Sequence, residues 1–298
     1  MELVSIQKMK VSYVCQLLGH CRQAFYQSKA DIVKEVEHER RIVEAVKAIR
    51  AEDPRIGGYK LWLMLINMFG RSYMIGRDRF FVTLRRRGLM LPKPKPRHTT
   101  NSNHRYHKWK NLIKNYRLWV ADITYIALAN GDVCYLHLIT DAYSHMIVGW
   151  ALAETLKASV SIQALQMAID QATAVHGSST LTGLIHHSDR GVQYCCDAYI
   201  AKLKEHDITI SMTEDYNPTD NAIAERINGI LKMEDIYSRK QLRSFEHACD
   251  VIPRFISFYN YRRPHMSIAY KTPAVAHTEK GEQKKMWKKK CLKKNAET

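Results

Sequence analysis

The sequence predicts an α/β fold that follows an all-helical N-terminal region. Apolar residues recur at helical spacing through residues 11–87, whereas β-branched runs dominate from about Arg117 onward. In this second part three strand patterns come first, and helical and strand patterns then alternate. Between the two parts, residues 91–103 alternate proline with basic residues and end in a polar run, which is typical of an extended linker.

The N-terminal region begins with two short amphipathic patterns, at residues 11–18 and 22–27, which Gly19 separates. Such a pair fits a helix-turn-helix and an ordinary helical hairpin equally well. Residues 35–49 then predict a further amphipathic helix, because apolar residues return at helical spacing among charged ones.

A second helical pair follows Asp53-Pro54, where a helix is expected to start. Residues 59–69 are strongly apolar, Gly70 interrupts them, and residues 76–87 predict a basic second helix. This pair is the better candidate for a helix-turn-helix, and we expect its arginines to contact DNA. The alternative is a solvated basic face on a helix that packs through its aromatic side chains. The arginines are Arg77, Arg79, Arg85, Arg86 and Arg87.

The composition favours a polyanionic partner. The chain of 298 residues carries 46 Lys and Arg against 29 Asp and Glu, a formal net charge of +17. DNA or RNA therefore comes before a membrane as the expected partner. No apolar run reaches the roughly 18 residues that span a bilayer, and the N-terminus lacks the pattern of a secretory signal. We expect no membrane association and a cytoplasmic location.

The cysteines indicate neither disulfides nor zinc. All seven are scattered without a paired spacing, so we expect reduced thiols. A structural zinc site is disfavoured because Cys15, His20, Cys21 and His38 do not have the spacing of a zinc-binding module.

Strand and helix patterns divide the second part as follows. Asn130-Gly131-Asp132 is a strong hairpin signal between the first two strands. The pattern by itself assigns only an α/β class. Strands are expected at residues 118–128, 133–140, 146–151, 181–188 and 208–212, and helices at residues 157–175, 197–206 and 244–258.

Three carboxylates stand in distinctive local settings. Asp122 interrupts the apolar residues of the first strand, Asp189 ends the fourth strand, and Glu225 lies in a helical pattern after the intervening 35 residues. Carboxylates are costly to bury unless they are paired or bound to a metal. Two strand acids and one helix acid could converge as hard oxygen ligands for Mg²⁺, which is a signature of metal-dependent phosphoryl transfer.

Several blocks of sequence resemble one protein family in the family's own order. The blocks are Pro-Arg-Ile-Gly-Gly-Tyr-Lys-Leu at 54–61, Trp-Val-Ala-Asp at 119–122, His-Ser-Asp-Arg-Gly-Val-Gln-Tyr at 187–194, Asn-Ala-Ile-Ala-Glu-Arg-Ile-Asn-Gly-Ile-Leu-Lys at 221–232, Tyr-Asn-Tyr-Arg-Arg-Pro-His at 259–265 and Thr-Pro at 272–273. The chain thereby resembles the DDE transposases of the retroviral-integrase superfamily, and most closely the frameshift-encoded, copy-out-paste-in insertion-sequence transposases. This resemblance implies a ribonuclease-H-like catalytic core.

The resemblance also implies roles for the three acids. Two divalent cations, Mg²⁺ or Mn²⁺, would serve both ends of an in-line displacement at phosphorus. Asp122 would bridge both ions, Asp189 would complete the shell of one, and Glu225 would complete the other. Asp141 resembles a further acidic position of the family, and we interpret it as structural or as a residue behind the site.

DNA contacts are expected around the helix that carries Glu225. By the resemblance, Lys232, seven residues after Glu225, would bind terminal DNA phosphates, although a solvated lysine is the plain alternative. Asn221 and Asn228 share the helix face of Glu225 by their spacing. His187 could orient DNA or a metal-bound water, or be an ordinary polar neighbour of Asp189. The other expected DNA contacts are Arg226, Arg190, Lys93, Lys95 and Arg263.

The expected organisation has five parts. They are a helix-turn-helix-like segment at 1–30, a helical DNA-binding domain at 31–91, a basic proline-rich linker at 92–110, a ribonuclease-H-like core with a C-terminal helix at 111–275, and a lysine-rich tail at 276–298. The tail is expected to seek phosphates, and a solubilising role is the alternative.

The functional hypothesis is a DNA transposase that cleaves an insertion-sequence end and joins its 3′-hydroxyl to another phosphodiester. Two alternatives stay open, a noncatalytic DNA-binding regulator and a ribonuclease-H-like nuclease. We expect a homo-oligomer in the DNA complex at the bacterial nucleoid. The protein of an upstream reading frame is a further possible partner, because the chain has no sustained heptads before residue 50.

Overall fold

The computed structural model describes residues 10–92, 117–177, 179–212, 222–236, 238, 242–281 and 283. The expected DNA contacts of Lys93, Lys95 and Asn221, and most of the lysine-rich tail, lie outside the described residues. The chain forms two compact units, Met1–Ile49 with Leu65–Met90, and Arg50–Met64 with Leu91–Thr298. Each unit is therefore built from two separate stretches of sequence.

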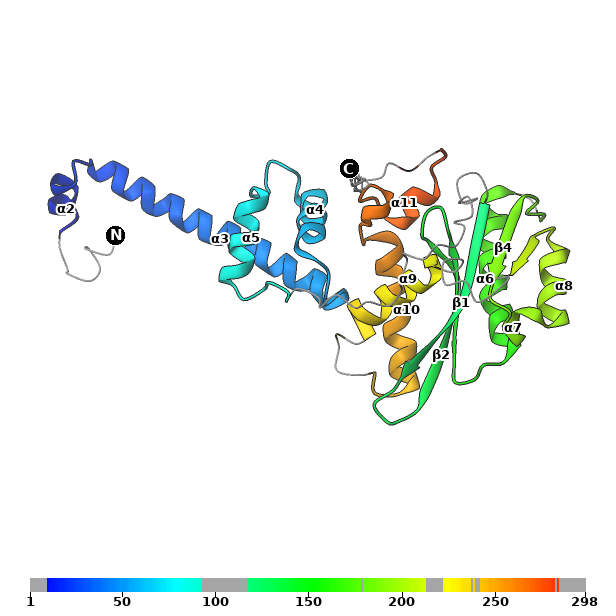
Figure 1. Ribbon diagram of the computed structural model, residues 1–298. Coiled ribbons are helices and arrows are strands. Elements are labelled where there is room, and N and C mark those ends of the chain that lie inside the picture. The colour runs from blue at the N-terminus through cyan, green and yellow to red at the C-terminus, as the bar shows by residue number, and fades with distance from the viewer. Residues whose placement is uncertain are drawn as a thin grey trace, which may run out of the picture. The chain divides into compact units, whose positions relative to one another are not determined.

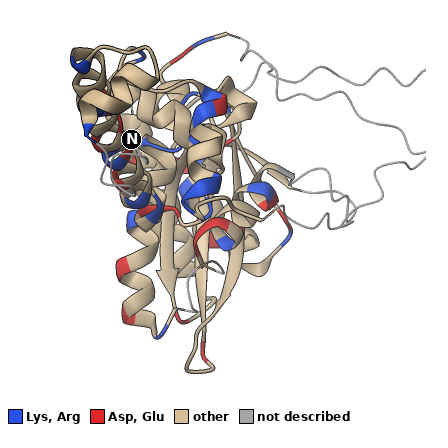
Figure 2. Cartoon of the chain, turned by 90° about the vertical axis from the view of Figure 1, so that its left-hand side faces the viewer, with Lys and Arg blue, Asp and Glu red and all other residues tan. Residues whose placement is uncertain are grey.

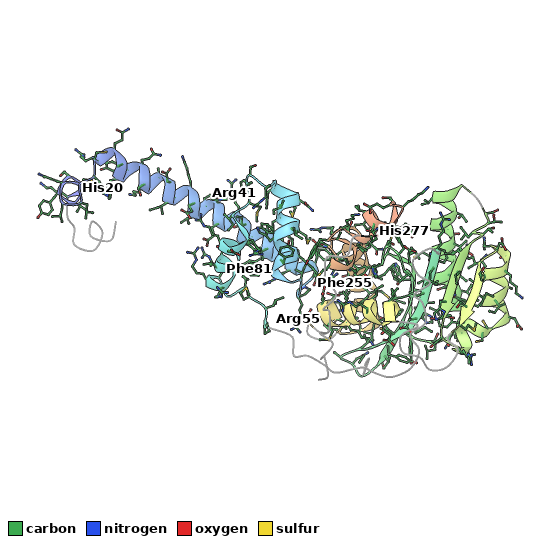
Figure 3. All side chains as sticks on the ribbon, turned by 45° about the horizontal axis from the view of Figure 1, so that its top comes forward. His20, Arg41, Arg55, Phe81, Phe255 and His277 are labelled. Carbon is green, nitrogen blue, oxygen red and sulfur yellow. The ribbon has the colours of Figure 1, made fainter. Side chains whose placement is uncertain are left out.

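The first unit is helical. Helix α2 (Val11–Leu17) is followed by α3 (Arg22–Glu52), and the unit also contains the end of α4 (Gly58–Phe69) and all of α5 (Arg77–Arg86). Its core contains the buried side chains Ile42, Val43, Val46, Ile49, Leu65, Phe80 and Leu84. The neighbouring Phe81 on α5, labelled in Figure 3, lies edge-on to Phe80 with ring centroids 6.2 Å apart.

The prediction of separate helices at residues 22–27 and 35–49 is wrong, because α3 is one helix of 31 residues. The intervening residues 28–34 contain neither glycine nor proline and so do not interrupt a helix. The helix also runs through the expected segment boundary at residues 30 and 31. It ends just before Asp53-Pro54, because a residue that precedes proline is driven out of the α conformation.

The second unit contains one five-stranded sheet. Its strands are β1 (Arg117–Ala127), β2 (Val133–Asp141), β3 (Ile147–Ala153), β4 (Leu184–Ser188) and β5 (Thr209–Met212). They lie in the order β3-β2-β1-β4-β5, with β1, β2 and β3 antiparallel in sequence and β4 and β5 parallel to β1. This order confirms the ribonuclease-H-like prediction, and the hairpin turns at Gly131 with φ of 93°.

Helices cover both faces of the sheet (Figure 1). On one face, α6 (Ala158–His176), α7 (Val192–Cys195) and α8 (Asp197–Glu205) pack over a core that includes Trp119, Ile139 and Leu165. The short helix α7 was not expected from the sequence. The other face is covered by α9 (Ala222–Ile230), the π-helical turn η2 (Leu231–Ile236) and α10 (Phe245–Tyr261). Phe255 of α10, labelled in Figure 3, belongs to this second core.

Asp141 and the C-terminal elements organise the turn after β2. The Asp141 carboxylate accepts a hydrogen bond from the Ser144 backbone N–H at 2.9 Å, and the Nδ1 atom of His277 lies 3.3 Å from it. His277 ends helix α11 (Pro273–His277), which follows the 3-10 turn η3 (Met266–Ile268). Asp141 therefore has the structural role that was expected of it. His145 completes the turn in the left-handed conformation, with φ of 61°.

Two further expectations concern cysteines and membranes. Six cysteines are described, and each has a free thiol, namely Cys15, Cys21, Cys134, Cys195, Cys196 and Cys249. Within the described part of the chain no helix is long and apolar enough to cross a membrane.

Candidate active site

Asp122 lies near the middle of β1, the central strand of the sheet. Its Oδ1 atom accepts a hydrogen bond from the backbone N–H of Ile123 at 2.9 Å, and its Oδ2 atom accepts one from Asn228 Nδ2 at 2.6 Å. Asn228 is only 7% exposed and comes from α9 on the helical layer. The two bonds fix the orientation of the Asp122 carboxylate from the strand and from the helix together.

Asp189 follows directly after β4, the parallel neighbour of β1. The register pairs Val120 with His187, so two further residues along each strand bring Asp189 alongside Asp122. The backbone N–H of Gly191 donates to Asp189 Oδ1 at 2.9 Å. A Cβ atom at Gly191 would stand 2.9 Å from the same oxygen, so glycine leaves room for this carboxylate.

Glu225 lies in the first turn of α9 and is exposed. The helix is held on the sheet by its other face, where the buried Ala224 packs with Val120, and the buried Ile227 and Leu231 join the core around α10. This amphipathic division explains why the sequence places two charged residues, Glu225 and Arg226, between the apolar Ala224 and Ile227. It leaves the Glu225 side chain free of the apolar core.

The three acids influence one another electrostatically. Burial, together with the charges of Asp189 and Glu225, raises the pKa of Asp122 to about 6, against the lowering effect of the hydrogen bonds from Ile123 and Asn228. A site in which ionised acids oppose one another favours a cation. The sequence-predicted acids are thus brought into one electrostatic neighbourhood.

The donor set suits a hard divalent cation, although it does not form a finished cage. Carboxylate oxygens are the ligands that Mg²⁺ prefers. Among the residues that the structure describes, the Oδ1 atom of Asn228 is buried without a hydrogen-bond partner beside Asp122. The described residues contain no group of three His, Cys, Asp or Glu side chains already arranged around a common metal position. The chemistry of the site fits a metal ion, and the exposed Asp189 and Glu225 side chains would complete its shell.

Lys232 and His187 also lie beside the acids. Lys232 in η2 is half-buried, and its pKa is lowered by burial while the charge of Asp122 opposes that shift. His187 on β4 places its Nδ1 atom 2.8 Å from Ser211 Oγ on β5. Arg190 and Arg226 are exposed and adjoin Asp189 and Glu225 in sequence. Asn228 differs from these residues, because its amide faces Asp122 and not the surface.

The buried position of Arg263 contradicts the expectation that this residue contacts DNA. Its side chain is 2% exposed, and its guanidinium donates to both carboxylate oxygens of Glu234, at 2.6 and 2.7 Å. A group enclosed in this way is not available to a phosphate or a base in this structure. The sequence shows a basic residue in a family block, but the nonlocal partner that buries it is visible only in the fold.

The arginines of α5 are largely engaged within their own unit. Glu39 on α3 binds both Arg86 and Arg87, Glu35 binds Arg79, and Arg77 binds Asp78. Arg85 is exposed. Figure 2 shows Lys and Arg interspersed with Asp and Glu along the helices. The expected basic face is therefore partly neutralised, and its contact with DNA stays a prediction.

Two contributors to the site were not among the residues expected to bind metal or DNA. Tyr194 on α7 is 3% exposed, and burial raises its pKa, with further contributions from Tyr199, Asp122 and Asp189. Gly191 holds Asp189 through its backbone N–H. The signal for both was their place in the block after Asp189.

Several known proteins resemble this chain in sequence. Two family models, both described as "Integrase core domain", match this chain, one at residues 114–218 and the other at residues 206–273. A 31 kDa protein of insertion element IS600 from Shigella sonnei is 32% identical over 276 residues, which cover 88% of this chain and 96% of the relative. A transposase for insertion sequence element IS629, also from Shigella sonnei, is 32% identical over 160 residues, 54% of this chain and 51% of that protein.

Other matches cover less of the protein concerned than the match to the IS600 protein does. The chain spans about half the length of its relatives in Mycobacterium tuberculosis, 52% in the alignment with a protein of element IS986/IS6110. Among solved structures, the simian T-cell lymphotropic virus intasome has 19% identity and a TM-score of 0.45, with 80% of this chain and 76% of that chain covered. A TM-score below 0.5 does not support a fold assignment, so the ribonuclease-H-like assignment is based on the strand order. The integrase core match and the nearly full-length relative lead to one conclusion: the chain belongs to the insertion-sequence transposases of the retroviral-integrase superfamily.

Proposed function

We propose that this chain is a DNA transposase, a polynucleotidyl transferase that hydrolyses one strand at an element end and directs the freed 3′-hydroxyl onto a second phosphodiester. The observation that carries the proposal is that Asp189 and Glu225 lie close enough to Asp122 for their charges to raise its pKa. Asp122 and Asp189 stand on adjacent parallel strands, and α9, which bears Glu225, packs over β1. Membership of the transposase family supports the same reaction class.

The proposed ligands are Asp122, Asp189 and Glu225, which would hold divalent cations, Mg²⁺ or Mn²⁺. When bound, such ions supply an activated nucleophile and stabilise charge at the leaving oxygen. Asn228 orients Asp122 through the 2.6 Å hydrogen bond, and the Gly191 N–H orients Asp189. Because these bonds exist before substrate arrives, the oxygen ligands need little reorganisation on binding.

The DNA-binding surface is proposed around the same acids. Lys232 lies close enough for Asp122 to affect its pKa, so a phosphate beside the site could contact its ammonium. The exposed Arg190 and Arg226 flank the acids in sequence and would neutralise further phosphates. We also propose a homo-oligomer in the DNA complex, because an insertion sequence has two ends and each chain carries one set of acids.

The test uses the full chain, a labelled duplex that ends in the element's terminal sequence, and Mg²⁺. Products are separated on denaturing gels. Asp122→Asn, Asp189→Asn and Glu225→Gln should each lower strand cleavage by about 10³-fold or more while DNA binding persists. The control is Asp170→Asn, since Asp170 is exposed on α6 over the opposite face of the sheet.

The products distinguish the proposal from its two competitors. Joined strands support a transposase. Nicked DNA with no joined product favours a ribonuclease-H-like nuclease, and binding with no cleavage in any divalent cation favours a noncatalytic regulator. Cleavage at the wild-type rate in all three acid variants would reject the proposed site.

A further inference from the structure

The second unit contains a cluster of five ionisable side chains that are largely buried. We call it the Arg263 cluster, and its members are Asp53, Lys60, Glu234, Arg263 and His265. Asp53 is 0% exposed, Arg263 2% and His265 5%. The members come from the stretch before α4 and its first turn, from η2, and from the turn after α10. Charged side chains are almost never buried this completely unless they are paired.

Arg263 is the centre of the cluster and makes its strongest contacts. Its Nε and Nη2 atoms donate to Glu234 Oε2 and Oε1 at 2.7 and 2.6 Å, which is a bidentate pair. Its Nη1 atom lies 2.9 Å from His265 Nε2. Burial and then the charge of Arg263 hold the pKa of His265 well below its ordinary value, so the ring is neutral and accepts this hydrogen bond.

Two carboxyl groups face Arg263, and they differ in protonation. Burial opposes ionisation of Glu234, but the hydrogen bonds and charge of Arg263 prevail and lower its pKa. Burial and Glu234 raise the pKa of Asp53 to about 8. Glu234 is thus the ionised partner near neutral pH, and Lys60 Nζ stands 3.7 Å from its Oε1 atom. Glu234 in η2 therefore has two cationic neighbours, Lys60 and Arg263, from separate parts of the chain.

The position of Glu234 connects the cluster to the candidate active site. Glu234 lies nine residues after Glu225 and two after Lys232, on the helical run formed by α9 and η2. This run touches the core through Leu231 and Ile236, which are each 1% exposed. Apolar contacts of this kind are not directional. Two directional contacts fix how the run is rotated: the hydrogen bond from Asn228 to Asp122 in α9, and the bidentate pair of Arg263 with Glu234 in η2.

The π-helical turn makes the rotation sensitive to this contact. A π turn has wider spacing than an α turn, and single π turns inside helices are often found at functional sites. A return of residues 231–236 to α geometry would change the direction of Lys232 relative to Glu225. The bond from Arg263 to Glu234 opposes that change, because it anchors the second half of the turn.

Stability alone is a weak explanation for this pair. Removing two charges from water costs about as much as their attraction returns, and apolar replacements of buried ion pairs are often neutral or stabilising. The bidentate geometry of Arg263 therefore points to a role in fixing the position of Glu234. The Tyr259 hydroxyl beside it donates to the carbonyl oxygen of His145 at 3.1 Å, which ties the same region to the turn after β2.

We propose that Arg263 is a positioning residue, which sets the placement of Glu225 and Lys232 by holding Glu234 in the π-helical turn. The inference rests on the proposed function, because it assigns Glu225 and Lys232 to the reaction. It gives Arg263 a role in the interior in place of a contact with DNA.

The experiment compares four variants of the full chain. Arg263→Lys keeps the charge but loses the bidentate fork. Glu234→Gln keeps the size and leaves Arg263 without its ionised partner. The double variant Arg263→Met with Glu234→Met removes both charges, so its free energy of unfolding should return toward the wild-type value. The control is Arg262→Gln, since Arg262 pairs with Glu52 on the surface and does not reach η2.

Three quantities are measured: the free energy of unfolding, the single-turnover cleavage rate at saturating DNA, and Ca²⁺ affinity without DNA from the rise in Tm. Removing a residue that orients metal ligands typically costs about 10- to 100-fold in metal affinity or activity. We expect losses of this size in Arg263→Lys and in the double variant. Arg262→Gln should match the wild type in cleavage rate and Ca²⁺ affinity.

The outcomes separate positioning from stability. A double variant that regains stability but neither cleavage rate nor Ca²⁺ affinity supports the inference. A double variant that regains all three overturns it, and so does Arg263→Lys at wild-type rate and affinity. Ca²⁺ binding by a wild-type protein that cleaves no DNA would reject the proposed function, and the affinities of the variants would still decide this inference. No ion binding by the wild type would overturn both.

Discussion

Asp122 is held in a place that is costly for its charge, so replacing it with asparagine should stabilise the ion-free protein. Burial and the two neighbouring acids raise the pKa of Asp122 from 3.8 to about 6. Asparagine has almost the same shape and no charge. Its amide can also satisfy Asn228, because a turn of the Asn228 amide would present the Oδ1 atom that now has no partner among the described residues.

The sign and size follow from the linkage between proton binding and folding. A raised pKa in the folded state means that the carboxyl group contributes stability at low pH, which is lost as pH rises through about 6. At pH 7.5 the ionised group therefore destabilises the fold by up to about 3 kcal/mol, and at pH 5 by about half of that. Because the side chain is half-buried, we expect Asp122→Asn to gain about 1 to 3 kcal/mol at pH 7.5.

Urea unfolding in EDTA measures the difference. Wild type and Asp122→Asn are compared at pH 7.5 and pH 5, and other titrating groups cancel between the two proteins. Adding Mg²⁺ should raise the stability of the wild type more than that of the variant. A variant that is no more stable than the wild type at pH 7.5, or whose advantage is unchanged at pH 5, would contradict this expectation.

Three further substitutions test separate contacts. Asn228→Ala removes a bond that lowers the pKa of Asp122, so the acidic limb of the cleavage pH profile should move to higher pH; an unmoved limb would exclude this role. Gly191→Ala should displace the Asp189 carboxylate and slow cleavage by at least about 10-fold, with a urea midpoint near wild type, and equal losses of both would point to misfolding instead. Gly149→Ala should destabilise the unit by about 3 kcal/mol in urea, because its Cβ would stand 2.1 Å from the Ala164 carbonyl oxygen; a wild-type midpoint would show that β3 and α6 separate freely.

Much of the second unit could be predicted from local pattern. Strands β1 and β2 and helix α6 begin and end within one or two residues of expectation, because apolar periodicity and the Asn130-Gly131 turn are local signals. The strand order is not local, and the resemblance to a known family supplied it. Helix α7 was missed because four residues are too short to show a period.

The candidate site shows the same limit. The sequence predicted that Asp122 lies in one strand and that Asp189 ends another. The parallel pairing of β1 with β4 brings the two residues together as expected. The partner of a buried charge is not readable, because Glu234 and Arg263 are separated by an entire helix in the sequence. Asn228 was placed on the correct helix, but its spacing could not tell whether it faces DNA or Asp122.

The second unit includes residues 50–64, which precede the proline-rich stretch in the sequence. A fragment that begins after residue 92 would thus lack part of its own interior, including the completely enclosed Asp53. Recombinant dissection of this protein should keep those fifteen positions with the sheet, by fusing them through a short connector or by coexpressing both pieces.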